Sequence, residues 1–140
     1  MRNSRMTVAV HILSYLVFAS GKRPDPVTSE QIAKSVRTNP VVIRRLLGLL
    51  RDSGMVRSKR GVNAGWTLAR SPKAITLLDV YNAVHDDSIF GPHASPPNPQ
   101  CPIGRGLPST LRKVYGSLEG ELRRQLARTS VDDVLTETLG

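Results

Sequence analysis

Residues 28–69 contain the feature that most constrains the fold: two helices in immediate succession, each with its own start signal. The segment Thr28-Ser29-Glu30-Gln31 has the form of a capping box, in which the threonine and glutamine side chains satisfy backbone N–H groups where a helix begins. Asn39 and Pro40 suit the N-cap and first position of the next helix. This second helix has one apolar face with i, i+3, i+4, i+7 spacing, formed by Ile43, Leu46, Leu47 and Leu50.

A β-hairpin is predicted directly after these helices. Gly54 ends the second helix, residues 55–59 and 66–69 have the character of short strands, and residues 60–65 form the turn between them. The connection between the helices, residues 36–39, has the length used in helix-turn-helix motifs. The sequence therefore predicts a mainly α-helical fold, namely a winged helix-turn-helix domain with a two-stranded wing.

Further helices are predicted on both sides of this motif. The apolar stretch 6–19 predicts an amphipathic core helix that is too short to span a bilayer. Its buried side is predicted to consist of Met6, Val10, Leu13 and Val17. Thr76, with Asp79 three residues later, is predicted to cap a helix after the hairpin. We expect this first domain to cover residues 1–85.

The rest of the chain is predicted to hold a linker and two helices. Residues 86–106 form a proline-rich linker, because five of the eleven residues 92–102 are proline and no apolar period survives. A long helix is predicted from about Pro108 to Arg128, followed by a short helix capped by Ser130. The long helix carries an apolar seam of Leu111, Val114, Leu118 and Leu122. This seam either joins two copies of the chain or packs onto its own monomer, and we expect residues 107–140 to be dimerisation helices.

The positive charge is concentrated in the first half of the chain. Residues 1–70 contain 13 Lys or Arg and 3 acidic residues, whereas residues 71–140 contain 7 and 8. Fifteen of the 20 cations are arginine, whose planar fork suits phosphates and guanine edges. Such a surface attracts polyanions, nucleic acid first and an anionic membrane second. The aromatic content of 4% argues against RNA recognition by base stacking.

The exposed face of the second motif helix suits the major groove of double-stranded DNA. Arg44, Gly48 and Arg51 follow one another at i, i+4 and i+7 along one edge. We expect Arg44 or Arg45 to contact a guanine and Arg51 to contact a phosphate. Two apolar residues at the start of this helix are expected to touch thymine methyl groups, namely Val41 and Val42.

The hairpin is predicted to supply a second group of DNA contacts through Arg57, Lys59 and Arg60. We expect Arg60 to enter the minor groove, because narrowed A·T-rich stretches attract arginine. We expect the N–H groups that begin the first motif helix to form a further phosphate site. The remaining predicted DNA-binding residues are Thr28, Ser29, Asn39, Ser58, Gly61 and Asn63.

Several of these stretches together resemble the signature of the Rrf2 family of bacterial winged-helix regulators. They are Ile43-Arg44-Arg45-Leu46-Leu47, Gly54-Met55-Val56 and the wing from Ser58 to Trp66. The wing departs from the family pattern in one of its paired glycines, which is Ala64 here, and Trp66 stands where Tyr or Phe is usual. The resemblance implies a homodimer whose long C-terminal helices cross and whose monomers each bind half of a palindromic operator. We therefore expect a sequence-specific transcriptional repressor.

The cysteine content separates this chain from the cluster-binding members of the family that it resembles. Those members carry three cysteines in the segment corresponding to the linker, whereas this chain has only Cys101. An iron–sulfur cluster ordinarily needs several thiolates, and His85 and His93 show no recognisable metal-ligand spacing, so we expect no cofactor and no metal. Cys101 either docks the linker as a small residue or senses oxidation or nitrosation.

Other function classes are less compatible with the sequence. It contains no catalytic triad, Walker loop or dinucleotide fingerprint, so we do not expect an enzyme. The main alternative is a general, architectural nucleic-acid-binding protein without a specific operator or signal. One cysteine and no membrane-spanning stretch favour the cytoplasm, with DNA and a second copy of the chain as partners and no membrane.

Overall fold

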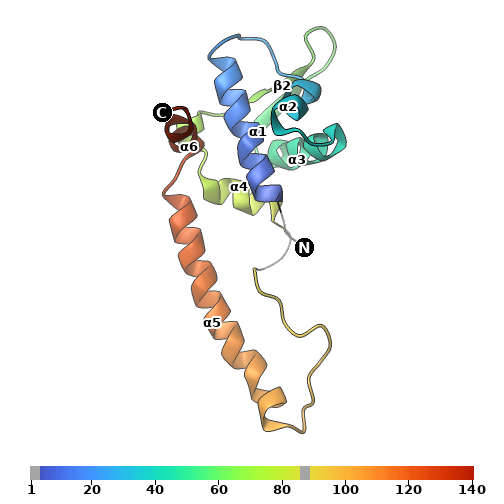
Figure 1. Ribbon diagram of the computed structural model, residues 1–140, viewed down its shortest axis with the longest axis vertical. Helices are drawn as coiled ribbons and strands as arrows, with labels where there is room; N and C mark the ends of the chain where they lie inside the picture. The colour runs from blue at the N-terminus through green and yellow to red at the C-terminus, as the bar shows by residue number, and fades with distance from the viewer. Residues whose placement is uncertain (1–3, 86–88) are drawn as a thin grey trace. The chain divides into compact units, whose positions relative to one another are not determined.

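The computed structural model describes residues 4–85 and 89–140, so the first three residues of the predicted linker, 86–88, lie outside the described residues. The described chain is mainly helical and contains one two-stranded antiparallel sheet, which confirms the predicted fold class (Figure 1). The elements are α1 (Arg5–Ser20), α2 (Ser29–Val36), α3 (Pro40–Asp52), β1 (Val56–Lys59), β2 (Gly65–Leu68), the 3-10 helix η1 (Pro72–Ala74), α4 (Leu77–Val84), α5 (Pro102–Ala127) and α6 (Val131–Leu139).

The chain divides into two compact units. The first unit is Met1–His85 together with Leu126–Gly140, and the second unit is Asp86–Gln125. No described helix is long and apolar enough to cross a bilayer.

Side-chain caps set the starts of the helices in the first unit. The Gln31 N–H donates to Thr28 Oγ1 at 3.1 Å, and the Thr28 N–H donates to Gln31 Oε1 at 2.9 Å, which completes the predicted capping box of α2. Asn39 caps α3, and Pro40 occupies its first turn. Reciprocal boxes of the same kind begin α4 and α6, as predicted. These starts follow from neighbouring residues alone, because a cap satisfies N–H groups that the first helical turn leaves unpaired.

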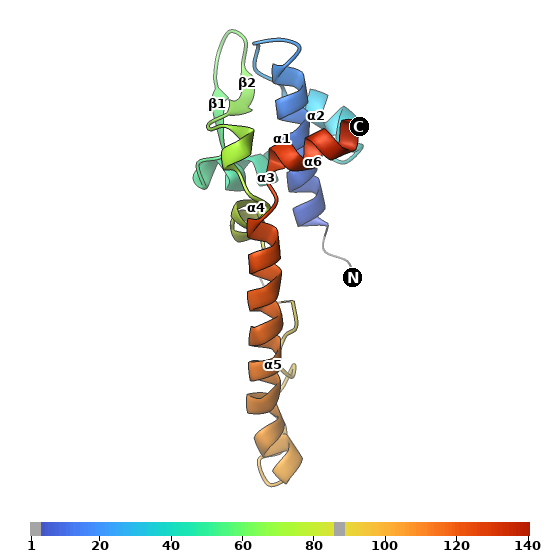
Figure 2. The same ribbon diagram turned by 90° about the vertical axis from the view of Figure 1, so that its left-hand side faces the viewer.

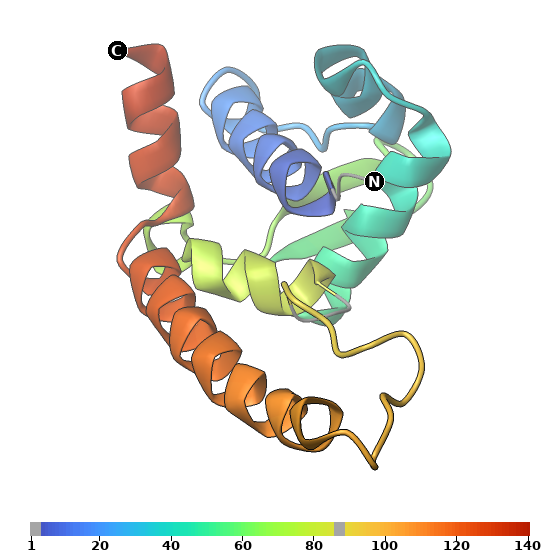
Figure 3. The ribbon, with the colours of Figure 1, turned by 60° about the horizontal axis from the view of Figure 1, so that its bottom comes forward.

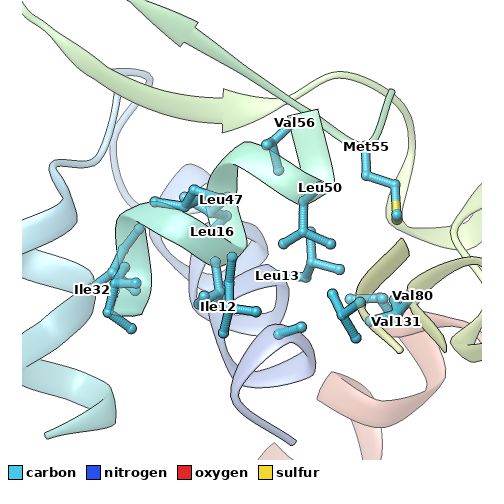
Figure 4. Close-up of a cluster of buried hydrophobic side chains, with 14 of the residues drawn as sticks. Ile12, Leu13, Leu16, Ile32, Leu47, Leu50, Met55, Val56, Val80 and Val131 are labelled. Atoms are coloured by element: carbon cyan, nitrogen blue, oxygen red, sulfur yellow. The ribbon is translucent and has the colours of Figure 1, made fainter. Parts of the chain in front are cut away.

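The core of the first unit lies between α1, α2, α3, α4 and α6 (Figure 4). All four residues of the predicted α3 stripe are buried, at 2% exposure or less. On α1 the prediction was wrong in part, because Met6, Val10 and Val17 are only partly buried. The buried face of α1 is instead Ala9, Ile12, Leu13 and Leu16. Since α1 is apolar around most of its circumference, the surrounding helices decide which face is covered.

The wing is tied to the body of the first unit through β2 (Figure 2). Trp66 pairs with Ser58 of β1 on one side and with Val27 on the other. The Val27 N–H donates to the Trp66 carbonyl at 3.0 Å, and the Trp66 N–H donates to the Val27 carbonyl at 2.7 Å. Gly65 is required beside this bridge, because a Cβ atom there would lie 2.8 Å from the Val27 oxygen.

Helix α6 packs into the first unit beside α1 (Figure 3). Val131 is completely buried in the core, and its N–H donates to the Ile75 carbonyl at 2.9 Å. The Leu77 N–H donates to the Thr129 carbonyl, also at 2.9 Å. From the sequence, this helix was expected to belong to the dimerisation helices of residues 107–140. In the structure α6 contacts the chain's own α1 and η1, while Leu139 near its end is 63% exposed.

Helix α5 begins earlier than predicted, at Pro102 instead of about Pro108, so residues 102–106 of the predicted linker are helical. The reason lies in the turn that precedes it. The Cys101 N–H donates to the Asn98 carbonyl at 3.3 Å, and a Cβ atom on Gly104 would lie 2.5 Å from that same oxygen. Glycine at 104 therefore lets the turn fold against the first turn of α5. Pro108 lies inside the helix, where it lacks the N–H that would donate to the Gly104 carbonyl and its ring crowds that carbonyl.

Candidate nucleic-acid interface

The surface of α3 opposite its buried stripe is open to solvent. Val41 is 51% exposed and Val42 is 37% exposed, so both predicted thymine-contacting side chains are available. Arg44, Arg45 and Arg51 are exposed on the same helix. The predicted division of α3 into a core face and a free face is therefore confirmed.

The three arginines of α3 differ in their contacts with other side chains. Arg44 Nη1 lies 3.7 Å from Glu30 Oε1 of α2, with both side chains more than half exposed. Arg51 Nε lies 3.4 Å from Asp52 Oδ1, and its guanidinium lies 6.0 Å from the centre of the Trp66 ring. Arg45 makes no ion pair with any residue of 4–85 or 89–140. Because exposed ion pairs contribute little stability, a phosphate or a guanine can replace the carboxylate at Arg44 or Arg51 at small cost.

The cations of the wing also differ in whether they contact another part of the described chain. Arg57 Nη2 donates to the Ala69 carbonyl at 3.2 Å, so this side chain is directed along the hairpin. Lys59 and Arg60 are exposed and form no ion pair within the described part of the chain. The turn after them needs left-handed backbone at Gly61, with φ of 83°. The exposed charges of the wing, Lys59 and Arg60, therefore lie next to its turn, while Arg57 links the two sides of the hairpin.

The start of α2 carries the predicted phosphate site, but its two side chains are not equivalent. The Thr28 hydroxyl is occupied by the capping box. Ser29 is 7% exposed, and its hydroxyl donates to Glu30 Oε2 at 3.3 Å. The Ser29 side chain is therefore turned away from the surface.

The polar residues predicted around these elements also have defined places. Asn39 Oδ1 accepts the Val41 N–H at 2.8 Å, so this side chain serves α3 as its cap. Ser58 and Asn63 are exposed on the wing, and Asn63 adopts left-handed backbone with φ of 59°.

Sequence reasoning missed Arg37, which lies in the turn between α2 and α3. Its backbone is left-handed, with φ of 61°, and its N–H donates to the Ala33 carbonyl at 2.7 Å as α2 ends. Its side chain is exposed near the start of α3. The one signal available in the sequence was a cation inside the helix-turn-helix connection.

Comparison with known proteins identifies the family. The profile of the Rrf2 family, described as iron-dependent transcriptional regulators, matches residues 2–137. YwnA of Bacillus subtilis (strain 168), assigned as an HTH-type transcriptional regulator, is 39% identical over 136 residues, which cover 96% of this chain and 97% of YwnA. The chain belongs to the Rrf2 family. It is therefore a transcriptional regulator with a DNA-binding fold and not an enzyme.

Solved structures agree with this Rrf2 assignment. A crystal structure of a protein described as DNA-binding is 36% identical, has a TM-score of 0.75, and is matched over 94% of this chain and 99% of its own. IscR of T. potens has a TM-score of 0.72 at 20% identity, over 99% of this chain and 88% of IscR. CymR of B. subtilis, the global cysteine regulator, has a TM-score of 0.66 at 20% identity, over 98% and 97%. The last two similarities show the shared fold.

The iron in the Rrf2 family description raises the question of whether this chain has the ligands for it. Cys101 is the single cysteine of the sequence. Among residues 4–85 and 89–140, no three His, Cys, Asp or Glu side chains are placed to hold one metal ion. The donor set of one chain does not fit an iron–sulfur cluster, which ordinarily requires several thiolates.

Proposed function

We propose that this Rrf2-family chain is a homodimeric, cytoplasmic repressor that binds a palindromic operator. Each monomer would place α3 in the major groove and the wing in the adjacent minor groove. The observation that carries the proposal is a set of exposed cations on these two projecting elements that form no ion pair with any described residue, Arg45 on α3 and Lys59 and Arg60 on the wing.

Specific reading of DNA would come from α3. Arg44 or Arg45 can donate two hydrogen bonds to guanine O6 and N7, which is a discriminating contact worth about 1–3 kcal/mol. Val41 and Val42 are exposed at the start of α3, where apolar groups can contact thymine methyls. Arg51, one to two turns further along, and the start of α2 would bind phosphates and fix the register.

The dimer is supported by α5. This helix has 26 residues and none of them is buried within its own chain. Val114 is 49% exposed and Leu118 is 47% exposed, and both belong to the predicted seam with the partly buried Leu111 and Leu122. An apolar stripe of this length is stabilised when a second copy covers it.

Selection of bound DNA from a random pool by the purified full-length protein tests the proposed function. We expect a two-fold-symmetric consensus whose half-site centres lie about one helical turn, or a multiple of it, apart. Failure to enrich any sequence would instead support a general, architectural nucleic-acid-binding protein.

We also propose that Cys101 senses oxidation or nitrosation. Its thiol accepts hydrogen bonds from the N–H groups of Gly104 and Ile103 in the first turn of α5, and these bonds lower the pKa of the thiol. A thiolate is the reactive form of cysteine. The test compares operator binding by the wild type and by Cys101→Ser after treatment with peroxide or a nitric-oxide donor. Identical responses of the two proteins would show that Cys101 has no sensing role.

We further propose that the regulator works without an iron–sulfur cluster, because the chain supplies one thiol. Protein purified without exposure to air should lack the visible sulfur-to-iron charge-transfer bands. Their presence, with iron and sulfide in stoichiometric amounts, would contradict this part of the proposal.

A further inference from the structure

The second unit contains a groove that lies outside the proposed DNA-binding surface and shares Leu111 with the apolar seam. Residues 90–93, in the loop before α5, form one wall of the groove, and one face of α5 forms the other wall. Its volume is about 580 Å³. Sites for small organic molecules typically enclose about 300–1,000 Å³.

The walls of this groove are largely apolar and aromatic. The rings of Phe90 and Tyr115 lie with their centroids 4.9 Å apart and their planes tilted by 33°. Phe90 nevertheless remains 50% exposed. Pro92 and Leu111 extend the apolar lining. Flat, apolar groups bind well against such surfaces, because aromatic rings combine a large contact area with few rotatable bonds.

The charge in the lining favours an anion. Arg112 is exposed in the groove and forms no ion pair with another described residue. The other charged residue of the lining, Glu119, is paired with Arg123, with 3.6 Å between Oε1 and Nη2. His93 adds a ring that can donate a hydrogen bond. An arginine fork binds a carboxylate through two parallel hydrogen bonds.

The groove and the seam are on different faces of α5. Pro108, Arg112, Tyr115 and Glu119 face the groove. At 100° per residue, this stripe and the seam stripe are roughly 90° apart around the helix and adjoin at Leu111. A second copy bound along the seam would therefore leave most of the groove open.

We propose that this groove binds a small organic anion with a flat apolar body, of the aromatic carboxylate class. The carboxylate pairs with Arg112, and the apolar body lies against Phe90 and Tyr115. This ligand site goes beyond the proposed DNA-binding function. Direct binding measurements need no DNA, so they separate failure of the ligand site from failure of the operator model.

The test is a calorimetric titration of the full-length protein with 1-naphthoate and with its neutral analogue 1-naphthamide. We expect saturable binding of one naphthoate per chain, and affinity for the amide lower by roughly tenfold or more, since a charge-assisted hydrogen bond contributes about that much. Absence of saturable naphthoate binding, or equal affinity for the two compounds, would overturn the proposal.

Two pairs of matched variants locate the site. Arg112→Gln should weaken naphthoate binding by roughly tenfold, while Lys113→Gln removes the same charge from the next residue, outside the groove lining, and should leave it unchanged. Gly116→Leu should block the groove, because Gly116 lines it and a Cβ atom there would have no other atom within 4 Å, so the new side chain has room to enter. Gly106→Leu places the same side chain in open space elsewhere on α5.

These variants distinguish loss of naphthoate binding from loss of folding. Replacing a helical glycine by leucine favours the helix, so loss of binding in Gly116→Leu is not explained by unfolding. Equal effects within either pair would show that naphthoate binds elsewhere, and would refute the proposed site.

Discussion

Single side chains of the interface differ in whether they are already engaged within the chain. Arg57 donates to the Ala69 carbonyl and Arg44 pairs with Glu30, whereas Arg60 lies exposed at the turn of the wing. An engaged arginine must give up a partner within the chain when DNA binds, whereas an arginine without a partner among the described residues exchanges hydrogen bonds to water alone. Arg60 is therefore the residue whose removal should be most informative.

Replacing Arg60 with alanine should weaken operator binding and lower the dependence of affinity on salt. Each phosphate contact that is lost reduces the slope of log affinity against log salt concentration by about 1. Fluorescence anisotropy titrations across salt concentrations measure both quantities. Lys73→Ala on η1 removes an equal charge outside the predicted interface and should change neither. An unchanged slope in Arg60→Ala would remove this residue from the interface.

Cys101 should react with iodoacetamide at lower pH in the folded protein than in the unfolded chain. The N–H groups of Gly104 and Ile103 stabilise the thiolate and lower its pKa, so the thiolate forms below the pH of an ordinary cysteine, about 8.5. Alkylation rates measured against pH, without denaturant and in concentrated urea, give the two midpoints. Equal midpoints would contradict the hydrogen bonding at the start of α5.

At the level of elements, the sequence predicted those features that depend on close neighbours. The caps at Thr28, Asn39, Thr76 and Ser130 involve residues two or three positions apart, and each forms as expected. The buried stripe of α3 likewise follows from its spacing, because most of the apolar residues of that helix lie on one side, apart from Val41 and Val42 near its start.

Features that depend on packing between distant segments could not be predicted from the spacing of neighbouring residues. The start of α5 depends on Gly104 meeting the Asn98 backbone. The buried face of α1 depends on the helices that cover it. The burial of Ser29 and the engagement of Arg57 with Ala69 depend on tertiary contacts that residue type alone does not specify.

The wing offers a test at this scale, because β2 is joined to Val27 as well as to β1. Gly65→Ala would place Cβ 2.8 Å from the Val27 oxygen, so we expect a loss of about 2–3 kcal/mol in the free energy of unfolding. Gly61→Ala meets no atom within 4 Å and should cost only about 1 kcal/mol for its left-handed backbone. Urea denaturation compares them, and an equal or smaller loss for Gly65→Ala would contradict the close approach of these strands.

Helix α5 gives the corresponding test of the dimer. Leu118→Glu places a charge on the seam and should shift the protein from dimer to monomer in sedimentation equilibrium. Ser117→Glu adds the same charge to an exposed neighbouring position outside the seam and should leave the dimer intact. Because Leu118 is 47% exposed in one chain, its replacement should not unfold the monomer. A wild-type monomer at micromolar concentration would refute the dimer.

At the scale of the whole molecule, the two compact units carry different candidate functional surfaces. The first unit contains α3, the wing and most of the positive charge, and α6 returns to complete its core through Val131. The second unit contributes α5, the groove beside it and Cys101. This division explains why the DNA-binding half could be read from sequence, since the positions of its cations and apolar residues follow regular local patterns. The groove could not be predicted from the sequence, because one of its walls is a loop whose sequence has no regular apolar spacing.

Dimethyl sulfate footprinting on the selected operator tests the central claim most directly. The reagent methylates guanine N7 in the major groove and adenine N3 in the minor groove, so one experiment reports on α3 and on the wing together. We predict protected guanines in two symmetry-related half-sites about one helical turn, or a multiple of it, apart, with protected adenines beside them that Arg60→Ala exposes again. Protection without two-fold symmetry, or confined to one groove, would contradict the account.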